Sequence, residues 1–185
     1  LTAAGGEVQV VLTPAAHQFV PPLTLQVFSK NNIYSDLFSS RADILHVTLA
    51  SGFDLNLIAP ATANFIAKMA AGMADNLLST ILLSSSAPVL IAPAMDLGMW
   101  DHPAVQKNVA LLKERGTLIL DPEWGALASG LSGIGRMTDP QKIFDKTVSL
   151  LQNTSEKGKV ETPLAGEVVL VTAGPTREAI DPVRF

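Results

Sequence analysis

LNLIAPATAN, at residues 55–64, sets the framework from which the rest of the chain can be interpreted. Residues 55–59 form a short and nearly apolar run, as expected of a parallel strand that is covered on both faces. The small residues that follow lead into a helical pattern at residues 63–71. Ligands of α/β folds bind beyond the carboxyl ends of such strands, next to helix N-termini. The stretch therefore predicts a strand, a ligand-facing loop and a helix. The alternative is an ordinary turn capped by Thr62 or Asn64.

Similar units lie on both sides of this stretch. The further strand candidates are residues 8–12, 88–92 and 117–120, and the further helix candidates are residues 75–84, 102–115 and 140–152. Gly116 is well placed to end the second of these helices. This alternation predicts an α/β fold, a parallel sheet with helices on both faces.

The composition bounds the domain count and the class of protein. The 185 residues suffice for one full domain and a short appendage. Residues 1–152 are expected to form that domain. Residues 153–165 are polar and turn-rich, as in an interdomain linker. A strand expected at residues 167–172 would then begin a second domain at residues 166–185.

Charge and residue usage exclude several functions. A net charge of -4 argues against a nucleic-acid groove, which needs clustered Lys and Arg. No apolar run approaches the roughly 20 residues of a membrane helix. The absence of cysteine excludes disulfides and thiolate metal sites and is compatible with a cytoplasmic protein. No two histidines have metal-ligand spacing, so no metal is expected.

Three segments carry a resemblance to a known family. They are residues 59–64 (APATAN), 93–100 (PAMDLGMW) and 135–140 (GRMTDP). In this order they resemble the flavin-dependent cysteine decarboxylases, most closely the phosphopantothenoylcysteine decarboxylase domain of bifunctional coenzyme A biosynthesis flavoproteins. The resemblance implies a Rossmann-like flavoprotein fold. It places that fold's first strand and phosphate loop before residue 1, so we expect the chain to bind FMN weakly.

Residues 169–185 (VLVTAGPTREAIDPVRF) resemble the start of a phosphopantothenate–cysteine ligase domain. Gly174 and Asp181 occupy matching positions. CTP and Mg²⁺ would be needed only by the rest of such a domain, and no ligation is expected from residues 1–185.

The resemblance implies an FMN site. Its residues would be Thr13, Pro60, Ala61, Thr62, Asn64, Ser79 and Thr80. Thr13 would lie near the flavin phosphate, and Phe65 replaces a threonine of the family motif. Ser79 and Thr80 have an alternative role, because such hydroxyls often bond back to the preceding helical turn.

The resemblance also implies catalytic and substrate-binding residues. His46 would be the catalytic base, although a lone histidine between apolar residues is more often a packed or capping residue. Met95 and Asp96 lie in the segment that binds the substrate carboxylate. The family has asparagine at position 96; an amide can donate to a carboxylate, whereas an ionised aspartate repels it. The alternative is that Asp96 caps the following turn.

Residues 125–137 resemble the clamp that closes over the substrate, and by composition alone they are a lid or a surface loop. Ser129 replaces a cysteine that acts as proton donor in the family, and a hydroxyl is a much poorer acid than a thiol. Arg136 would pair with the substrate phosphate or hold the clamp.

The implied reaction converts 4'-phosphopantothenoylcysteine to 4'-phosphopantetheine. The cysteinyl side chain is oxidised at the flavin to a thioaldehyde, CO₂ leaves, and the resulting enethiolate is protonated and reduced. Serine at position 129 could stop the reaction at the oxidised enethiol. Family members assemble as homotrimers or higher oligomers. The alternatives are a peptidyl-cysteine decarboxylase, a flavin prenyltransferase or a non-catalytic regulatory subunit of the same fold.

Overall fold

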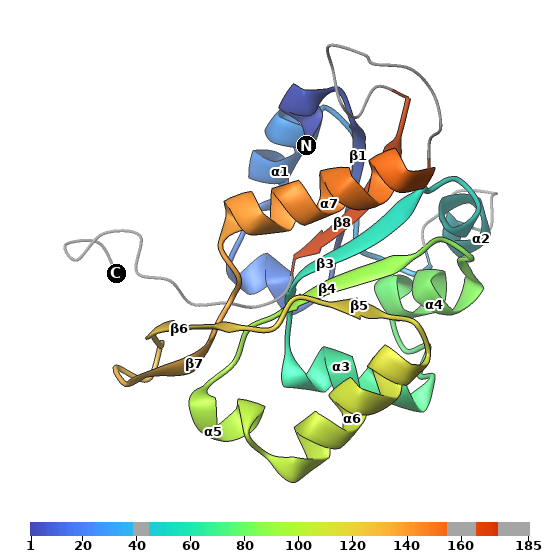
Figure 1. The fold of residues 1–185 in the computed structure, drawn as a ribbon. Helices are drawn as coiled ribbons and strands as arrows, with labels where there is room; N and C mark the ends of the chain where they lie inside the picture. Colours follow the sequence, from blue (N-terminus) through green and yellow to red (C-terminus); the bar gives the residue numbers. More distant parts are fainter. Residues whose placement is uncertain (39–44, 155–165, 174–185) are drawn as a thin grey trace.

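The computed structural model describes residues 1–38, 45–154 and 166–173. In these residues six strands form one parallel sheet (Figure 1). From edge to edge the strands are β2 (Ile33–Tyr34), β1 (Glu7–Leu12), β8 (Val168–Ala173), β3 (Leu55–Ala61), β4 (Val89–Pro93) and β5 (Leu118–Ile119). A separate antiparallel hairpin joins β6 (Glu123–Ala126) to β7 (Ser132–Arg136).

The helices connect and cover the strands. They are α1 (Pro22–Ser29), α2 (Leu45–Ala50), α3 (Ala63–Ala71), α4 (Leu77–Ser84), α5 (Leu97–Trp100), α6 (Pro103–Glu114) and α7 (Pro140–Thr154), with two 3₁₀ turns at Thr2–Ala4 and Ala16–Gln18. The predicted bounds of α3 agree with the structure, and those of α4, α6 and α7 differ by one or two residues at an end. No helix in the described ranges has the length and apolarity needed to cross a bilayer.

Neighbouring residues of the central strands enter two different cores. Ile58, Ile91 and Leu170 pack with side chains of α2, α3, α4 and α6. The residues that precede them, Leu57, Leu90 and Val169, pack instead with α7. Both faces of each strand are apolar, which explains why these strands read as continuous hydrophobic runs. The structure thus confirms a parallel sheet with helices on both faces.

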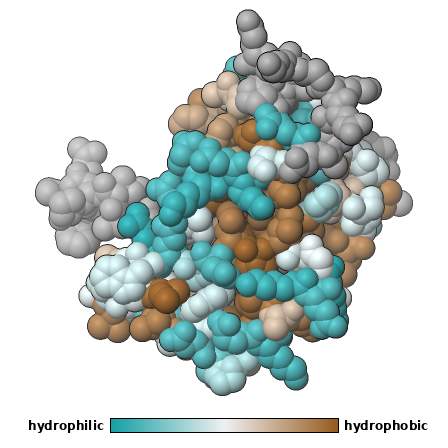
Figure 2. All heavy atoms as spheres, viewed as in Figure 1, coloured by the Kyte–Doolittle hydropathy of each residue, from teal (hydrophilic) through white to brown (hydrophobic). Residues whose placement is uncertain are grey.

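Helix α7 covers its face of the sheet with one stripe of side chains. Ile143, Thr147 and Leu151 are four residues apart and are 6%, 0% and 1% exposed. The buried Thr147 hydroxyl is satisfied because it donates to the Ile143 carbonyl at 2.8 Å. The opposite side of the helix is hydrophilic, as Figure 2 shows. This amphipathic pattern made the helix predictable from the sequence.

Strand β8 lies in the middle of the sheet, between β1 and β3. Six of its residues are in register with β1 and four with β3. The Asp54 side chain fixes its start, since its Oδ2 accepts from the Val168 N–H at 2.6 Å. The sequence predicts this strand but assigns it to the beginning of a second domain. Its place inside the sheet is decided by pairing between segments far apart in the chain.

Candidate functional site

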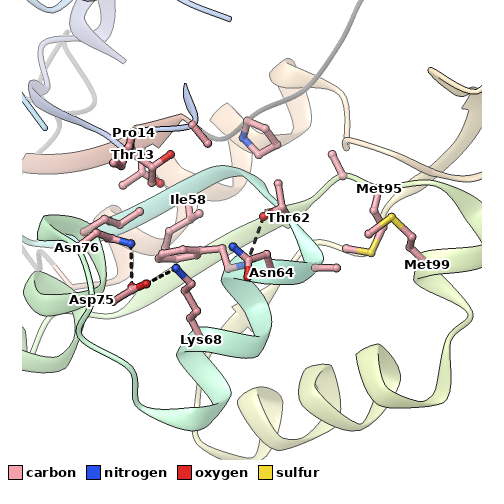
Figure 3. A pocket seen from close by; sticks show the side chains of 17 residues that line it. Thr13, Pro14, Ile58, Thr62, Asn64, Lys68, Asp75, Asn76, Met95 and Met99 are labelled. Carbon is pink, nitrogen blue, oxygen red and sulfur yellow. Dashed lines mark hydrogen bonds and ion pairs between the residues drawn. The ribbon is translucent and has the colours of Figure 1, made fainter. Parts of the chain in front are cut away.

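A cavity of about 540 Å³ lies at the carboxyl ends of β1 and β3, with the start of α3 and the loop after β4 in its wall (Figure 3). Its volume falls within the range of roughly 300–1,000 Å³ that is typical of small-molecule sites. The place is the one that parallel α/β sheets generally use for ligands, because loops and helix N-termini converge there.

Five of the residues expected at the active site line this cavity. They are Thr13, Pro60, Thr62, Asn64 and Met95. Ala61 lies directly beside them and is fully buried. Its carbonyl oxygen accepts from the Ala94 N–H at 3.0 Å, which holds together the chain segments that leave β3 and β4. The fold therefore gathers residues from distant parts of the chain around one cavity.

The loop after β3 serves the helix and the cavity together. Thr62 caps α3, since its Oγ1 accepts from the Phe65 N–H at 3.2 Å. The cap interpretation is thus confirmed for Thr62, although its side chain also borders the cavity. The N–H groups of the next two residues, Ala63 and Asn64, have no acceptor within a helix. They supply donors and the positive end of the helix dipole to an electron-rich ligand.

Ser79 and Thr80 use their hydroxyls within α4. The Ser79 Oγ accepts from the Asn76 N–H at 3.2 Å and so completes a capping box. The Thr80 hydroxyl donates to the Asn76 carbonyl at 2.8 Å. These contacts are the back-bonding alternative, and neither residue is among those that line the cavity.

Four polar residues of the cavity wall were not among the candidate site residues. They are Lys68, Asp75, Asn76 and Thr172. Lys68 of α3 forms an ion pair with Asp75, which precedes α4. The hydrogen bond from Lys68 lowers the pKa of the Asp75 carboxyl below its ordinary value of 3.8. Ser79 and Thr80, which the resemblance assigns to the FMN site, follow Asp75 by a few residues and could have pointed to it, whereas nothing local points to Lys68.

Thr172 reaches the cavity from the central strand β8. It is fully buried, and its Oγ1 has no hydrogen-bond partner in the described part of the chain. A buried hydroxyl without a partner costs about 1–3 kcal/mol, so a ligand that bonds to it is stabilised. The segment assigned by sequence to a second domain thereby contributes to this wall.

The segment with Met95 and Asp96 supports the hairpin. Asp96 caps α5, because its Oδ1 accepts from the Gly98 N–H at 3.3 Å. Its Oδ2 is buried and has no partner among the described residues. The Met95 N–H donates to the Gly135 carbonyl at 2.9 Å. The capping interpretation of Asp96 is therefore confirmed, and its second carboxylate oxygen remains free to accept a hydrogen bond in the described part of the chain.

Glycines let the hairpin pack closely against this segment. A Cβ added at Gly135 would lie 2.2 Å from the Met95 carbonyl oxygen, and one at Gly133 would lie 2.9 Å from Leu97 Cδ2. Within the hairpin, the Arg136 side chain occupies the space beside Gly125, 2.9 Å from where its Cβ would be. The glycine-rich stretch, expected to be a lid or a loop, is a docked two-stranded hairpin.

The remaining candidates for catalysis lie outside the cavity wall. His46 is half-buried on α2, Ser129 is exposed in the hairpin turn, and Arg136 is exposed on β7. None of the three is among the residues that line the cavity. Within the described chain, four of the residues expected to hold the cofactor thus line one cavity, Thr13, Pro60, Thr62 and Asn64, while those expected to transform the substrate do not.

The cavity fits a flavin nucleotide on three grounds. Its volume is sufficient, the start of α3 offers N–H donors, and the buried Thr172 hydroxyl lacks a partner. Thr13, Thr62 and Asn64 would hold the nucleotide together with these groups. The described residues contain no cluster of three or more His, Cys, Asp or Glu side chains suited to a metal ion.

Comparisons with known proteins identify the family of this chain. Residues 1–152 match the Flavoprotein family, and residues 164–185 match the DNA/pantothenate metabolism flavoprotein C-terminal domain. The coenzyme A biosynthesis bifunctional protein CoaBC of Bacillus subtilis (strain 168) is 46% identical over 187 residues, which cover 100% of this chain and 45% of the relative. A cysteine/cysteine sulfinic acid decarboxylase from an unknown prokaryotic organism is 52% identical over 168 residues, 90% of this chain and 46% of the relative.

A solved structure of a related protein has a similar fold. A PPC decarboxylase mutant complexed with pantothenoylaminoethenethiol superposes with a TM-score of 0.62 at 26% identity, over 80% of this chain and 99% of that chain. The chain spans less than half the length of the two curated relatives. The family match covers most of the chain and agrees with the parallel sheet and its helices. The chain belongs to the Flavoprotein family.

Proposed function

We propose that the chain catalyses the FMN-dependent decarboxylation of 4'-phosphopantothenoylcysteine to 4'-phosphopantetheine, a step of coenzyme A biosynthesis. The observation that carries this proposal is the convergence of Thr13, Pro60, Thr62, Asn64 and Met95 on one cavity of nucleotide size. Similarity to the Bacillus subtilis bifunctional protein and to the PPC decarboxylase structure supports the choice of substrate.

Bound FMN would supply the two-electron oxidation and the later reduction of the cysteinyl carbon. The chain's own residues bind and orient the reactants. The loop around Ala61, together with Thr62 and Asn64, holds the cofactor beside the substrate segment. Met95 forms the wall between the cavity and the hairpin, so the substrate would bind on that side. Ser79 and Thr80 act on the cofactor indirectly, by fixing the start of α4.

His46, Ser129 and Arg136 are proposed as base, proton donor and phosphate ligand. Because none of them lines the cavity within one described chain, the proposal includes a homotrimer or higher oligomer in which copies complete each other's sites. Analytical ultracentrifugation of the chain with FMN measures the oligomeric state and so tests the proposed assembly. A monomer that turns over substrate would contradict it.

Two further parts of the proposal concern the parent protein. Residues 164–185 match the C-terminal domain family, so a longer protein is proposed to ligate cysteine to 4'-phosphopantothenate with CTP and Mg²⁺. A cytoplasmic location is proposed as well, because its substrates are intermediates of a central biosynthetic route.

Two observations favour a second candidate, the decarboxylation of free cysteine or cysteine sulfinic acid. The relative with that name is 52% identical to this chain. In addition, Asp96 has a buried carboxylate oxygen without a partner. An aspartate suits the α-ammonium group of a free amino acid, whereas phosphopantothenoylcysteine carries an amide at that position and no ammonium.

The deciding experiment measures CO₂ release and product mass with FMN and either 4'-phosphopantothenoylcysteine or L-cysteine. Reduced 4'-phosphopantetheine supports the first candidate and shows that Ser129 permits the last reduction. A product two hydrogens lighter assigns the defect to Ser129. Release of CO₂ from L-cysteine alone supports the second candidate, and Asp96→Asn should then weaken its turnover. Yellow protein that releases no CO₂ from either compound would overturn both and favour a regulatory subunit.

A further inference from the structure

Lys68 and Asp75 place an ion pair in the cavity wall, next to Asn64 and Asn76 (Figure 3). Among the described residues that line the cavity, these are the two that carry charge. Lys68 lies one helical turn beyond Asn64 on α3, so both side chains project from the same face of the helix. The pair is therefore located where a bound nucleotide would meet it.

The carboxylate of Asp75 is held by several donors. Lys68 donates to its Oδ2. Asn76 Nδ2 and Ser79 Oγ donate to its Oδ1, at 3.1 and 3.3 Å. Because Asn76 and Ser79 also form the capping box of α4, the carboxylate is fixed relative to that helix. Most of its capacity to accept hydrogen bonds is thus used within the protein.

The ammonium of Lys68 has the opposite balance. It carries three N–H donors, and Asp75 is its one recorded acceptor in the described part of the chain. Its side chain remains 21% exposed, at the wall of the cavity. The pair consequently has few acceptor positions left and two donors to spare. The Lys68–Asp75 pair has no net charge, but it presents the free N–H donors of the Lys68 ammonium to a ligand.

We propose that Lys68, oriented by Asp75, donates a hydrogen bond to a negatively charged group of the bound flavin nucleotide. This inference rests on the proposed FMN site and identifies a positioning residue within it. A flavin nucleotide offers two such groups, the 5'-phosphate and the pyrimidine edge of the ring, which becomes anionic on reduction. A charge at that edge is one means by which a protein tunes the flavin.

The test compares binding of FMN and riboflavin by the wild-type chain and the Lys68→Met variant, in titrations extended until the wild type is saturated. A hydrogen bond to a charged group contributes about 1.5–3 kcal/mol, so Lys68→Met should weaken FMN binding roughly ten- to one-hundredfold. The Lys68→Arg variant retains a cation with N–H donors and should stay within a few-fold of the wild type.

The double variant Lys68→Met with Asp75→Asn separates hydrogen bonding from net charge. It is neutral at both positions, as the intact pair is overall. If Lys68 donates to the ligand, the double variant stays as weak as Lys68→Met. Recovery of wild-type affinity would show that Lys68 only compensates Asp75, and would overturn the proposal. Lys113→Met is the matched control, because Lys113 forms an exposed ion pair with Asp121 at 3.0 Å, away from the cavity.

Two further measurements identify the group that is bound. Loss of FMN affinity with unchanged riboflavin affinity assigns the contact to the phosphate. Equal loss for both flavins, with a lower reduction potential of the bound flavin, assigns it to the ring. A tenfold loss of preference for the reduced form corresponds to about 30 mV for a two-electron couple.

The proposal fails if Lys68→Met binds FMN as the wild type does. It fails together with the proposed function if the wild-type chain binds no FMN at saturating concentration. Thermal unfolding without ligand excludes a merely structural effect, since loss of a partly exposed ion pair should change the midpoint little.

Discussion

The cavity and the hairpin β6–β7 are built in contrasting ways. The cavity is lined by residues from β3, β8, α3 and α4 and from the segments that follow β1 and β4, and these elements share the buried core of the sheet. The hairpin is one continuous stretch that exposes Trp124, Leu131 and Ile134 at 71%, 60% and 44%. It is held by close contacts of two glycines with the segment at residues 95–97 and by an ion pair to α7.

This difference explains why the two groups of candidate residues fare differently. Thr13 is half-buried and Asn64 is exposed, but each directly adjoins a buried residue, Leu12 or Phe65, whose packing fixes the backbone there. Ser129 and Arg136 depend on a small element with few buried contacts, and such elements open at low free-energy cost. The residues proposed to bind the cofactor therefore lie on a preorganised framework, and Ser129 and Arg136, which are proposed to act on the substrate, depend on docking contacts.

The largest expected effect on the free energy of unfolding comes from a substitution in the core of the sheet. Leu170 is fully buried in β8, so Leu170→Ala should lower the free energy of unfolding by about 2–5 kcal/mol. The matched change in the hairpin, Leu131→Ala, removes a side chain that is 60% exposed and should alter it by less than about 0.5 kcal/mol. Urea denaturation measures both. Equal effects would show that β8 does not occupy the core of the sheet.

A second substitution tests how the hairpin packs against the segment at residues 95–97. In Gly135→Ala the new Cβ would overlap the Met95 carbonyl, so we expect the unfolding free energy to fall by about 1–3 kcal/mol, or the hairpin to detach. Chemical denaturation and limited proteolysis at residues 123–136 distinguish these outcomes. Gly98→Ala is the control, since nothing lies within 4 Å of its added Cβ. If both variants resist proteolysis like the wild type, Gly135 does not pack closely against the Met95 carbonyl.

A third change tests the local support of the cavity. Asn76 caps α4, because its Oδ1 accepts from the Ser79 N–H at 3.0 Å. Asn76→Ala should cost about 1 kcal/mol of unfolding free energy, whereas Asn76→Asp retains an acceptor and should cost less. Thermal unfolding compares the two variants. Equal losses would mean that the side-chain cap does not stabilise this helix.

The smallest effect concerns the ion pair between Lys142 of α7 and Glu123 of the hairpin, 2.8 Å apart. The hydrogen bond from Lys142 lowers the pKa of Glu123 below its ordinary value of 4.5. The stabilisation is therefore fully present above pH 4.5 and is lost as the pH falls through the lowered pKa. Because both groups are exposed, the effect on stability is small.

In Lys142→Met we expect the pKa of Glu123 to rise toward its ordinary value, which NMR titration of the Glu123 side chain measures directly. Lys107→Met on α6 is a control that leaves the pair intact. An unchanged Glu123 titration in Lys142→Met would show that the pair does not form in solution.

Much of the central architecture could be predicted because its signals are local. The apolar run of β3 and the Thr62 cap lie within a few residues of one another; the bounds of α3 agree with the structure, and β3 extends two residues beyond its predicted end. The cap of α6 at His102, whose Nδ1 accepts from the Ala104 N–H at 3.2 Å, likewise fits a residue expected near a helix start.

Other elements could not be predicted from local signals. Helices α2 and α5 have six and four residues, too few for an amphipathic period to be recognised. The hairpin was obscured by its glycines, which disfavour strands unless close packing requires them, as at Gly133 and Gly135. Its register, with Trp124 opposite Ile134, depends on contacts with residues 95–97 that lie outside the hairpin.

The sequence by itself determined the α/β class, the loop after β3 and five of the residues that line the cavity, because strand runs, caps and small residues act over short distances. Only the tertiary structure decided that β8 enters the sheet between β1 and β3, that Lys68 meets Asp75 at the cavity wall, and that His46 lies away from it. These outcomes depend on pairing and packing between distant segments, whose free energy no single stretch of the chain specifies.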